Sequence, residues 1–125
     1  MLSQFTVKNY KSFRDEMTLD MQAVAISEHT DSVLRAENGE LMLPVSVIYG
    51  PNGGGKSNML EALYAFCDRV LGPLYAAGSD VGNWGRIRNL DIVPFVFDPK
   101  FVEEATEFEL CKFRLNGLDI SHQTV

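Results

Sequence analysis

A chain of 125 residues, 46% of them hydrophobic, is long enough for one domain or part of a larger one with a packed core, which excludes intrinsic disorder. Its formal charge of −6 excludes a broad basic face for nucleic acid or for an anionic membrane on this chain. No run approaches the roughly 20 apolar residues of a spanning helix, and the start lacks a signal peptide's apolar core, so we expect a cytoplasmic protein with no membrane partner.

The first segments predict two antiparallel strands joined by a turn. Residues 2–7 and 16–21 alternate between the two sides of a chain at the period of a half-buried strand, and residues 8–15 form the turn between them. The side chains predicted to share one side are Ser3, Phe5 and Val7 in the first strand and Met17, Leu19 and Met21 in the second. The polar region 23–40 is predicted as a surface loop with a turn at Asn38 and Gly39.

The middle of the chain predicts a strand, a glycine-rich turn and a helix. Residues 43–49 ("LPVSVIY") form a nearly continuous apolar run, typical of a strand buried on both faces. From Ser57 onward apolar residues recur at spacings of three and four, which predicts a helix of about four turns that Gly72 and Pro73 end. The predicted apolar positions are Met59, Leu60, Leu63, Phe66, Cys67, Val70 and Leu71.

The last third of the chain predicts a loop followed by three strands. Residues 74–90 are rich in glycine, and we expect a loop with one short helical turn. The strands are predicted at 92–97, 107–115 and from Asp119 to the end. Apolar residues change sides within the middle strand, which favours a bulge near Cys111. Cys67 and Cys111 are expected to be buried free thiols rather than a disulfide, in keeping with a reducing cytoplasm.

Residues Gly50 to Ser57 match the phosphate-loop pattern G-x-x-x-x-G-K-[ST]. Glycines let the backbone wrap closely round a phosphate and point its N–H groups inward, while the following helix directs its positive end at the same place. Lys56 is predicted to reach the β and γ phosphates, and the Ser57 hydroxyl to bind Mg²⁺. The predicted nucleotide-binding residues here are Gly50, Asn52, Gly53, Gly54, Gly55, Lys56, Ser57 and Asn58.

The alternative is a glycine-rich turn that ends in Gly-Lys-Ser by chance. The predicted strand and helix fall on the sides that a phosphate loop requires, which favours binding of a purine triphosphate, ATP, with Mg²⁺. Lys56→Ala is then expected to abolish ATP binding without unfolding the chain.

The extended string "GPNGGGKSNMLEAL" resembles the phosphate loop of ABC-type ATPase heads in SMC proteins, RecF-type repair ATPases and OLD nucleases. Asn58, Leu60, Glu61 and Ala62 carry the likeness, whereas membrane-transporter domains more often read Gly-Lys-Ser-Thr-Leu-Leu. The resemblance implies an α/β P-loop NTPase fold. Residues 1–125 would be the N-terminal lobe of a head, with an antiparallel β portion beside the phosphate-loop strand and helix.

Two further stretches resemble related proteins. "FTVKNYKSFRDEMTLDM" is similar to the opening strand and turn of the same heads, which implies that Asn9, Lys11 and Ser12 approach the phosphates or ribose of the nucleotide. The alternative is a surface hairpin turn with a solvated lysine. "PFVFDPKFVEEATEFELCKFRLNG" resembles a strand segment of bacterial AAA/ABC-like ATPases associated with abortive infection and phage defence.

The sequence does not contain the groups that ATP hydrolysis by such a head requires. The ABC signature motif, the acidic strand and the switch histidine are absent, and Gln123 is a weak candidate for the Q-loop glutamine. Asp98 could bind metal in a compact kinase, but Pro94 disfavours a central strand there and Pro99 stands where a catalytic glutamate would follow. His29 and His122 are isolated and lack the spacing of metal ligands.

Three functions follow from these observations. The first is the ATP-binding lobe of an ABC/SMC-like ATPase, completed by missing segments or by a partner head in an ATP-linked dimer, with DNA contacted by the rest of the assembly if at all. The second is a nucleotide-binding module that does not hydrolyse ATP, and the third is a compact P-loop kinase that uses Asp98. An isolated lobe would leave sheet edges and apolar surface uncovered, so we expect self-association.

Overall fold

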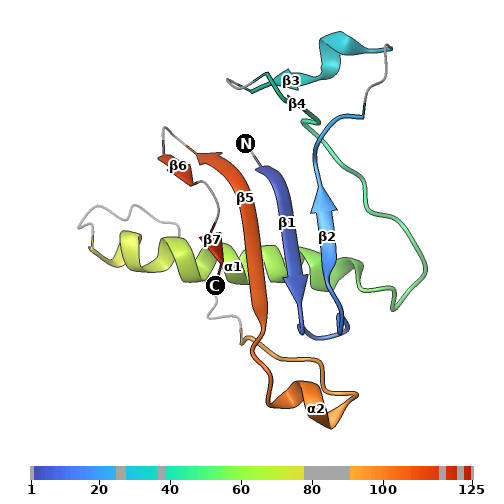
Figure 1. Cartoon of the computed structure of the whole chain (residues 1–125), viewed down its shortest axis with the longest axis vertical. Helices are drawn as coiled ribbons and strands as arrows, with labels where there is room; N and C mark the ends of the chain where they lie inside the picture. Colours follow the sequence, from blue (N-terminus) through green and yellow to red (C-terminus); the bar gives the residue numbers. More distant parts are fainter. Residues whose placement is uncertain are drawn as a thin grey trace.

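The computed structural model describes residues 2–24, 28–36, 39–77, 91–115, 118–120 and 123–124. They form one antiparallel sheet, a separate small hairpin and a long helix that crosses one face of the sheet (Figure 1). The mixed α/β class is therefore confirmed. Residues 78–90 of the predicted loop, together with Asn38 and His122, lie outside the described part.

The main sheet joins the two ends of the chain. Its strands are β1 (Leu2–Lys8), β2 (Met17–Asp20), β5 (Glu107–Leu115), β6 (Leu118–Ile120) and β7 (Gln123–Thr124). Their order is β2-β1-β5-β6, with β7 also paired to β5, and every pairing is antiparallel. The two N-terminal strands, the turn between them and the strand at 107–115 are thus confirmed, and the region from Asp119 onward contributes two short strands.

The predicted bulge near Cys111 is wrong. β1 and β5 keep one register from Leu2 opposite Phe113 to Lys8 opposite Glu107. Phe108 and Leu110 face the core, whereas Cys111 points to the other side and is only half-buried. A regular strand therefore accommodates the change of side without an extra residue.

Helix α1 (Lys56–Ala77) extends beyond its predicted end. Gly72 and Pro73 lie within its 22 residues, so the prediction that they stop it is wrong. Proline removes one backbone donor and disfavours a helix, but the loss of a single hydrogen bond need not end one. The prediction that Leu60 belongs to the apolar face of the helix is also wrong. Leu60 is 51% exposed, because α1 turns Met59, Ala62 and Phe66 to the sheet instead.

The core lies between α1 and the covered face of the sheet. Phe5 stands edge-on to Phe66 of the helix, with 5.8 Å between ring centroids, and Tyr10 stands edge-on to Phe108 at 5.7 Å. The buried cluster comprises Phe5, Val7, Tyr10, Phe13, Met59, Ala62, Ala65, Phe66, Phe108 and Leu110. Two members, Tyr10 and Phe13, belong to the β1–β2 turn, so core packing fixes this turn against the start of α1.

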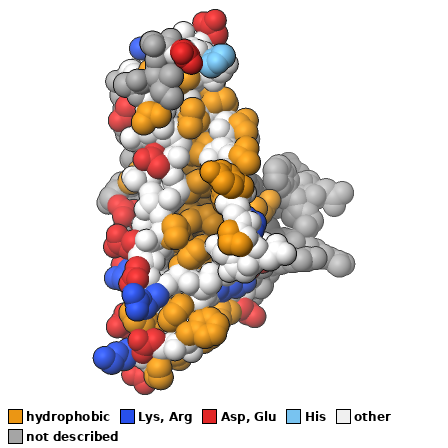
Figure 2. All heavy atoms as spheres, turned by 90° about the vertical axis from the view of Figure 1, so that its right-hand side faces the viewer, with side chains coloured by type: hydrophobic (Ala, Val, Ile, Leu, Met, Phe, Trp, Pro, Cys, Tyr) orange, Lys and Arg blue, Asp and Glu red, His pale blue; other side chains and the backbone are white. Residues whose placement is uncertain are grey.

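The predicted buried strand at 43–49 does not form. Among the described residues no strand pairs with this segment, and every residue after Leu43 is exposed: Val45 is 71%, Val47 77% and Tyr49 90% accessible. An apolar run becomes a buried strand only where neighbouring strands satisfy its backbone and further layers cover its faces. Figure 2 shows the side of the molecule on which the segment 43–49 lies, and hydrophobic side chains gather on this face.

Two other regions differ from prediction. In place of a plain loop at 23–40 there is a short 3₁₀ turn, η1 (Thr30–Ser32), and strand β3 (Leu34–Arg35), which pairs with β4 (Leu41–Met42). The predicted strand at 92–97 does not form: Pro94 lacks a donor, and the neighbouring backbone groups bond to the β1–β2 turn instead of to a strand.

No helix in the described ranges combines the length and the apolar character needed to cross a bilayer.

Candidate functional site

The loop of residues 50–55 precedes α1 and takes a shape that only glycine adopts readily. Gly53 and Gly55 have φ of 81° and 82°, in the left-handed region, and Gly50 has φ of 152°. The Gly54 N–H donates to the Pro51 carbonyl at 3.2 Å, which closes a turn within the loop. Residues 50–54 are exposed, so this backbone is open to solvent.

The start of α1 presents free backbone donors to the same place. The first bond that closes onto the helix from the loop is from the Met59 N–H to the Gly55 carbonyl, at 3.0 Å. Among the described residues, no backbone carbonyl accepts from the N–H groups of Lys56, Ser57 or Asn58. Unpaired N–H groups and the positive end of the helix dipole together favour an anion at this point.

The Lys56 side chain folds back over the loop. Its Nζ donates to the Gly50 carbonyl at 2.9 Å and to the Pro51 carbonyl at 2.7 Å. Both acceptors are exposed backbone oxygens, so an incoming anion can compete for the ammonium group. The lysine, the glycine backbone and the free helix donors therefore converge on one exposed spot.

The β1–β2 turn packs directly against this loop. A Cβ placed on Gly55 would come within 3.1 Å of the Ser12 Oγ, which shows how close the two segments lie. Three residues after Gly55, in the first turn of α1, the Asn58 Nδ2 donates to the Ser12 Oγ at 2.7 Å. The structure thus brings Ser12 and Asn58, which were singled out separately in the sequence, into contact.

Lys11 reaches the same helix from the turn. Its backbone has φ of 49°, and its N–H donates to the Val93 carbonyl at 2.8 Å. Its Nζ pairs with the Glu61 carboxylate and lies 5.6 Å from the centroid of the Tyr10 ring. The bond to Glu61 raises the pKa of Lys11 above its usual value, more than partial burial lowers it.

Asn9 has a different position from Lys11 and Ser12. Its side chain is fully buried and bonded at both ends: Nδ2 donates to the carbonyls of Phe101 and Glu104, each at 2.8 Å, and Oδ1 accepts from the Phe95 N–H at 2.9 Å. Because the side chain is buried and both ends are already hydrogen-bonded, the amide does not face a ligand at the surface. Direct contact with a nucleotide, which the resemblance implied, does not fit this placement.

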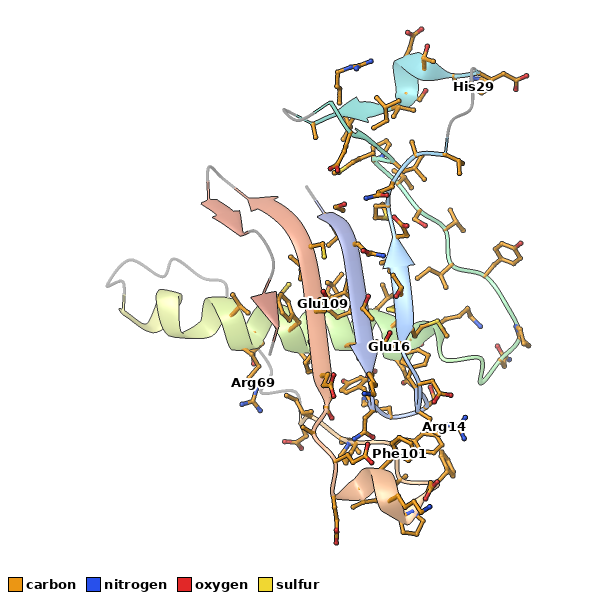
Figure 3. The ribbon with its side chains drawn as sticks, in the orientation of Figure 1. Arg14, Glu16, His29, Arg69, Phe101 and Glu109 are labelled. Carbon is orange, nitrogen blue, oxygen red and sulfur yellow. The ribbon has the colours of Figure 1, made fainter. Side chains whose placement is uncertain are left out.

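The contacts of Asn9 instead tie the turn to the segment 95–106. In Figure 3, Phe101 of the short helix α2 (Pro99–Val102) lies beside the turn near Arg14. The Phe95 and Phe101 rings stand edge-on with 6.0 Å between centroids, and the Thr106 hydroxyl donates to the Asn9 carbonyl at 2.7 Å. Nothing local in the sequence around Asn9 indicates these partners, because they lie about ninety residues away.

Asp98, the carboxylate that a kinase mechanism would need, caps α2. Its Oδ1 accepts from the Lys100 N–H at 3.1 Å, the usual role of an aspartate before a proline-led helix. His29 is exposed and lies beside the β3–β4 hairpin, far from α1 (Figure 3). Within the described part of the chain, no three His, Cys, Asp or Glu side chains are grouped to hold a metal ion.

A cavity of about 240 Å³ adjoins the loop on its apolar side, a feature that the sequence did not indicate. It lies between β2, the segment 48–51 and the first turn of α1. Its lining includes Phe13, Met17, Leu19, Ile48, Tyr49 and Met59, together with Lys56 at one side. The cavity is therefore largely apolar, and its polar side is formed by the loop itself and Lys56.

Comparison with known proteins gives one match. The family model described as "AAA domain, putative AbiEii toxin, Type IV TA system" matches residues 45–124. This range includes the loop at 50–55, α1 and β5, whereas β1, β2 and their turn precede it. No curated protein and no solved structure matches the chain.

Proposed function

This chain belongs to the AAA-domain family of putative AbiEii toxins of Type IV TA systems, and we propose that it binds Mg-ATP as the N-terminal lobe of an ABC/SMC-like ATPase. Membership of the family indicates a nucleotide-binding, ATPase-like domain. The identity of the nucleotide, the metal and the ABC-type architecture belong to the proposal.

One observation carries the proposal: the Lys56 ammonium, the glycine backbone of 50–55 and the unpaired N–H groups at the start of α1 meet at one exposed spot. A chain of phosphates is the ligand that uses all three, since it carries several negative charges and many acceptor oxygens. Lys56 would exchange its two carbonyl partners for phosphate oxygens. The residues present therefore fit a triphosphate.

The fit to Mg²⁺ rests on Ser57. Its side chain is exposed at the second position of α1, next to the donors that would hold the phosphates. Mg²⁺ in phosphate-loop sites is bound by a Ser or Thr hydroxyl, phosphate oxygens and water, usually with one carboxylate, so Ser57 would supply the first of these ligands. When bound, the metal would neutralise phosphate charge.

The other predicted residues have graded roles in this proposal. Asn52, Gly53 and Gly54 form the exposed cradle, Ser12 and Asn58 border it, and Lys11 supplies a second cation from the turn. Asn9 acts as a positioning residue, because its buried amide fixes the turn that carries Lys11 and Ser12.

Turnover of ATP by this chain alone is not expected. Hydrolysis requires a group that orients the attacking water, and usually a carboxylate as a further protein ligand of the metal. Asp98 is already the cap of α2, which disfavours the kinase alternative. We propose that missing segments or a partner head, in a homodimer or a heterodimer, complete the site, as the resemblance to SMC, RecF and OLD proteins implies.

The cellular setting follows the same resemblance. We propose a cytoplasmic ATPase that takes part in phage defence or DNA repair. The net charge of −6 gives this chain no broad surface for DNA, so any contact with DNA would come from the rest of the assembly.

Titration calorimetry with Mg-ATP tests the proposal. The wild-type chain is expected to bind ATP, Lys56→Ala to lose binding, and both to release negligible phosphate in a turnover assay. Lys100→Ala, which removes an exposed lysine from α2, is the matched control and should bind like wild type. Equal ATP affinity of Lys56→Ala and wild type would show that the loop does not hold the nucleotide.

A further inference from the structure

The Lys11–Glu61 ion pair joins the β1–β2 turn to the second turn of α1. Glu61 follows Ser57 by four residues, so the two side chains lie on the same face of the helix. One helical turn, about 5.4 Å, separates them along the axis. The pair therefore places a cation close to the point where the free donors of α1 begin.

Lys11 is restrained at both of its ends. Its backbone, which has a left-handed φ of 49°, is held by the bond from its N–H to the Val93 carbonyl. Its ammonium is held by the ion pair with Glu61. The Ser12–Asn58 bond holds the next residue of the turn against the same helix. A lysine side chain so restrained loses little further freedom when it binds a ligand.

We propose that Glu61 is a positioning residue that holds the Lys11 ammonium ready to bind the phosphates of the nucleotide. An ammonium group has three donors, so a bond to Glu61 leaves two for phosphate oxygens. The inference rests on the proposed function, because it assumes that the nucleotide lies at the start of α1. It differs from that function in assigning a role to a carboxylate that does not touch the ligand.

In the opposite role, Glu61 would compete with the phosphates for the Lys11 ammonium and so weaken nucleotide binding. The side chains of Lys11 and Glu61 are 29% and 40% exposed, so both can be changed with little disturbance of the core. The two roles predict changes of opposite sign in affinity when the carboxylate is neutralised. A purely structural role predicts a third pattern.

A double-mutant cycle separates these roles. Mg-ATP affinity is measured by titration calorimetry, at fixed ionic strength, for wild type, Glu61→Gln, Lys11→Met and the double variant, with the binding stoichiometry used to correct for inactive chain. Glu61→Gln is expected to weaken binding about 3- to 10-fold in wild type. In the Lys11→Met background it is expected to cause no loss, and a gain of up to about 2-fold, because a repelling carboxylate has been removed.

Other patterns overturn the inference. Equal weakening in both backgrounds would mean that Glu61 acts only on structure, and tighter binding in wild type would mean that it competes for Lys11. Asp68→Asn, which removes a carboxylate about two turns further along α1, is the control and should leave affinity within about 2-fold. If wild type binds ATP, Lys56→Ala does not and Glu61→Gln is unchanged, the inference fails and the proposed function stands; if wild type does not bind ATP, both fail.

Discussion

Gly55 lies against the ring of Phe13, so close that a Cβ on Gly55 would stand 2.8 Å from the Cε1 of that ring. Phe13 is a core residue that is 8% exposed, so the ring has little room to retreat. The glycine therefore serves the packing between the loop and the β1–β2 turn as well as the shape of the loop itself. This relationship can be separated from backbone strain by experiment.

Gly55→Ala is expected to destabilise the chain by about 2–3 kcal/mol, the sum of a strained left-handed residue and a steric clash. Gly53→Ala is the matched control, because φ is 81° there but nothing lies within 4 Å of a new Cβ, and about 1 kcal/mol is expected. Urea unfolding of both variants measures the difference. Equal losses would show that the contact with Phe13 does not matter.

Asn9→Asp is expected to destabilise the chain by about 3–5 kcal/mol, because the buried site would hold an acidic group facing the carbonyls of Phe101 and Glu104. Asn58→Asp is the control, since its single side-chain bond to Ser12 is exposed and less than about 1 kcal/mol is expected. Thermal or urea unfolding monitored by circular dichroism compares them. A loss at Asn9 as small as that at Asn58 would contradict the positioning role.

The stability that Lys11 contributes should depend on pH in the alkaline range. Its folded-state pKa is raised above the ordinary 10.5, so the contribution is fully present below about that pH and is lost as pH rises through the higher folded value. Burial also raises the pKa of the adjacent Tyr10 hydroxyl. The difference in unfolding free energy between wild type and Lys11→Met, expected to be at most about 1 kcal/mol for this partly exposed pair, should be constant from pH 7 to pH 9.5 and fall by pH 11.5. A difference that does not fall would contradict the ion pair.

Exposed apolar residues at 45–49 should make the chain self-associate. Tyr49→Lys and Val47→Lys are expected to shift the population toward monomer, because charge on an extended, unpaired segment opposes strand pairing between molecules. Val24→Lys is the control, since Val24 is 73% exposed but lies outside the segment. Light scattering across a concentration series measures the change. A wild-type chain that is monomeric at all concentrations would argue against an uncovered lobe.

The fold could be predicted where the determining interactions are local. Alternation in 2–7 and the strand-like apolar run in 107–115 predicted both central strands. The apolar spacing after Ser57 predicted the start and the buried face of α1, apart from Leu60 and from Leu71, whose side chain lies outside the described part. The run at 43–49 has the composition of a buried strand, but composition does not supply the neighbouring strands on which pairing depends. Pro94 and Pro73 show that one proline excludes a strand ladder more surely than it ends a helix.

The candidate site shows the same limit. The loop at 50–55 and its helix could be predicted from a short contiguous pattern. The resemblance at residues 5–21 predicted that Lys11 and Ser12 lie near this loop. The role of Asn9 could not be read in this way, because its partners at 95–106 become neighbours only through the sheet. In the sequence, Glu61 was only one of the residues that carry the family resemblance. Its ion pair with Lys11 could be identified only from the structure.

The pairing of β1 with β5 also bears on how the chain acquires its structure. Leu2 and Phe113 are partners across most of the chain's length, so the central pair of strands is a contact of very high sequence separation. Such contacts are slow to form, because a long loop must close before they give any stabilisation. During synthesis β1 and α1 leave the ribosome well before β5. The apolar side of α1 that packs on β1 and β5 therefore stays incompletely covered until residues 107–115 have been synthesised, and we expect the nascent chain to expose a surface that chaperones bind in that interval.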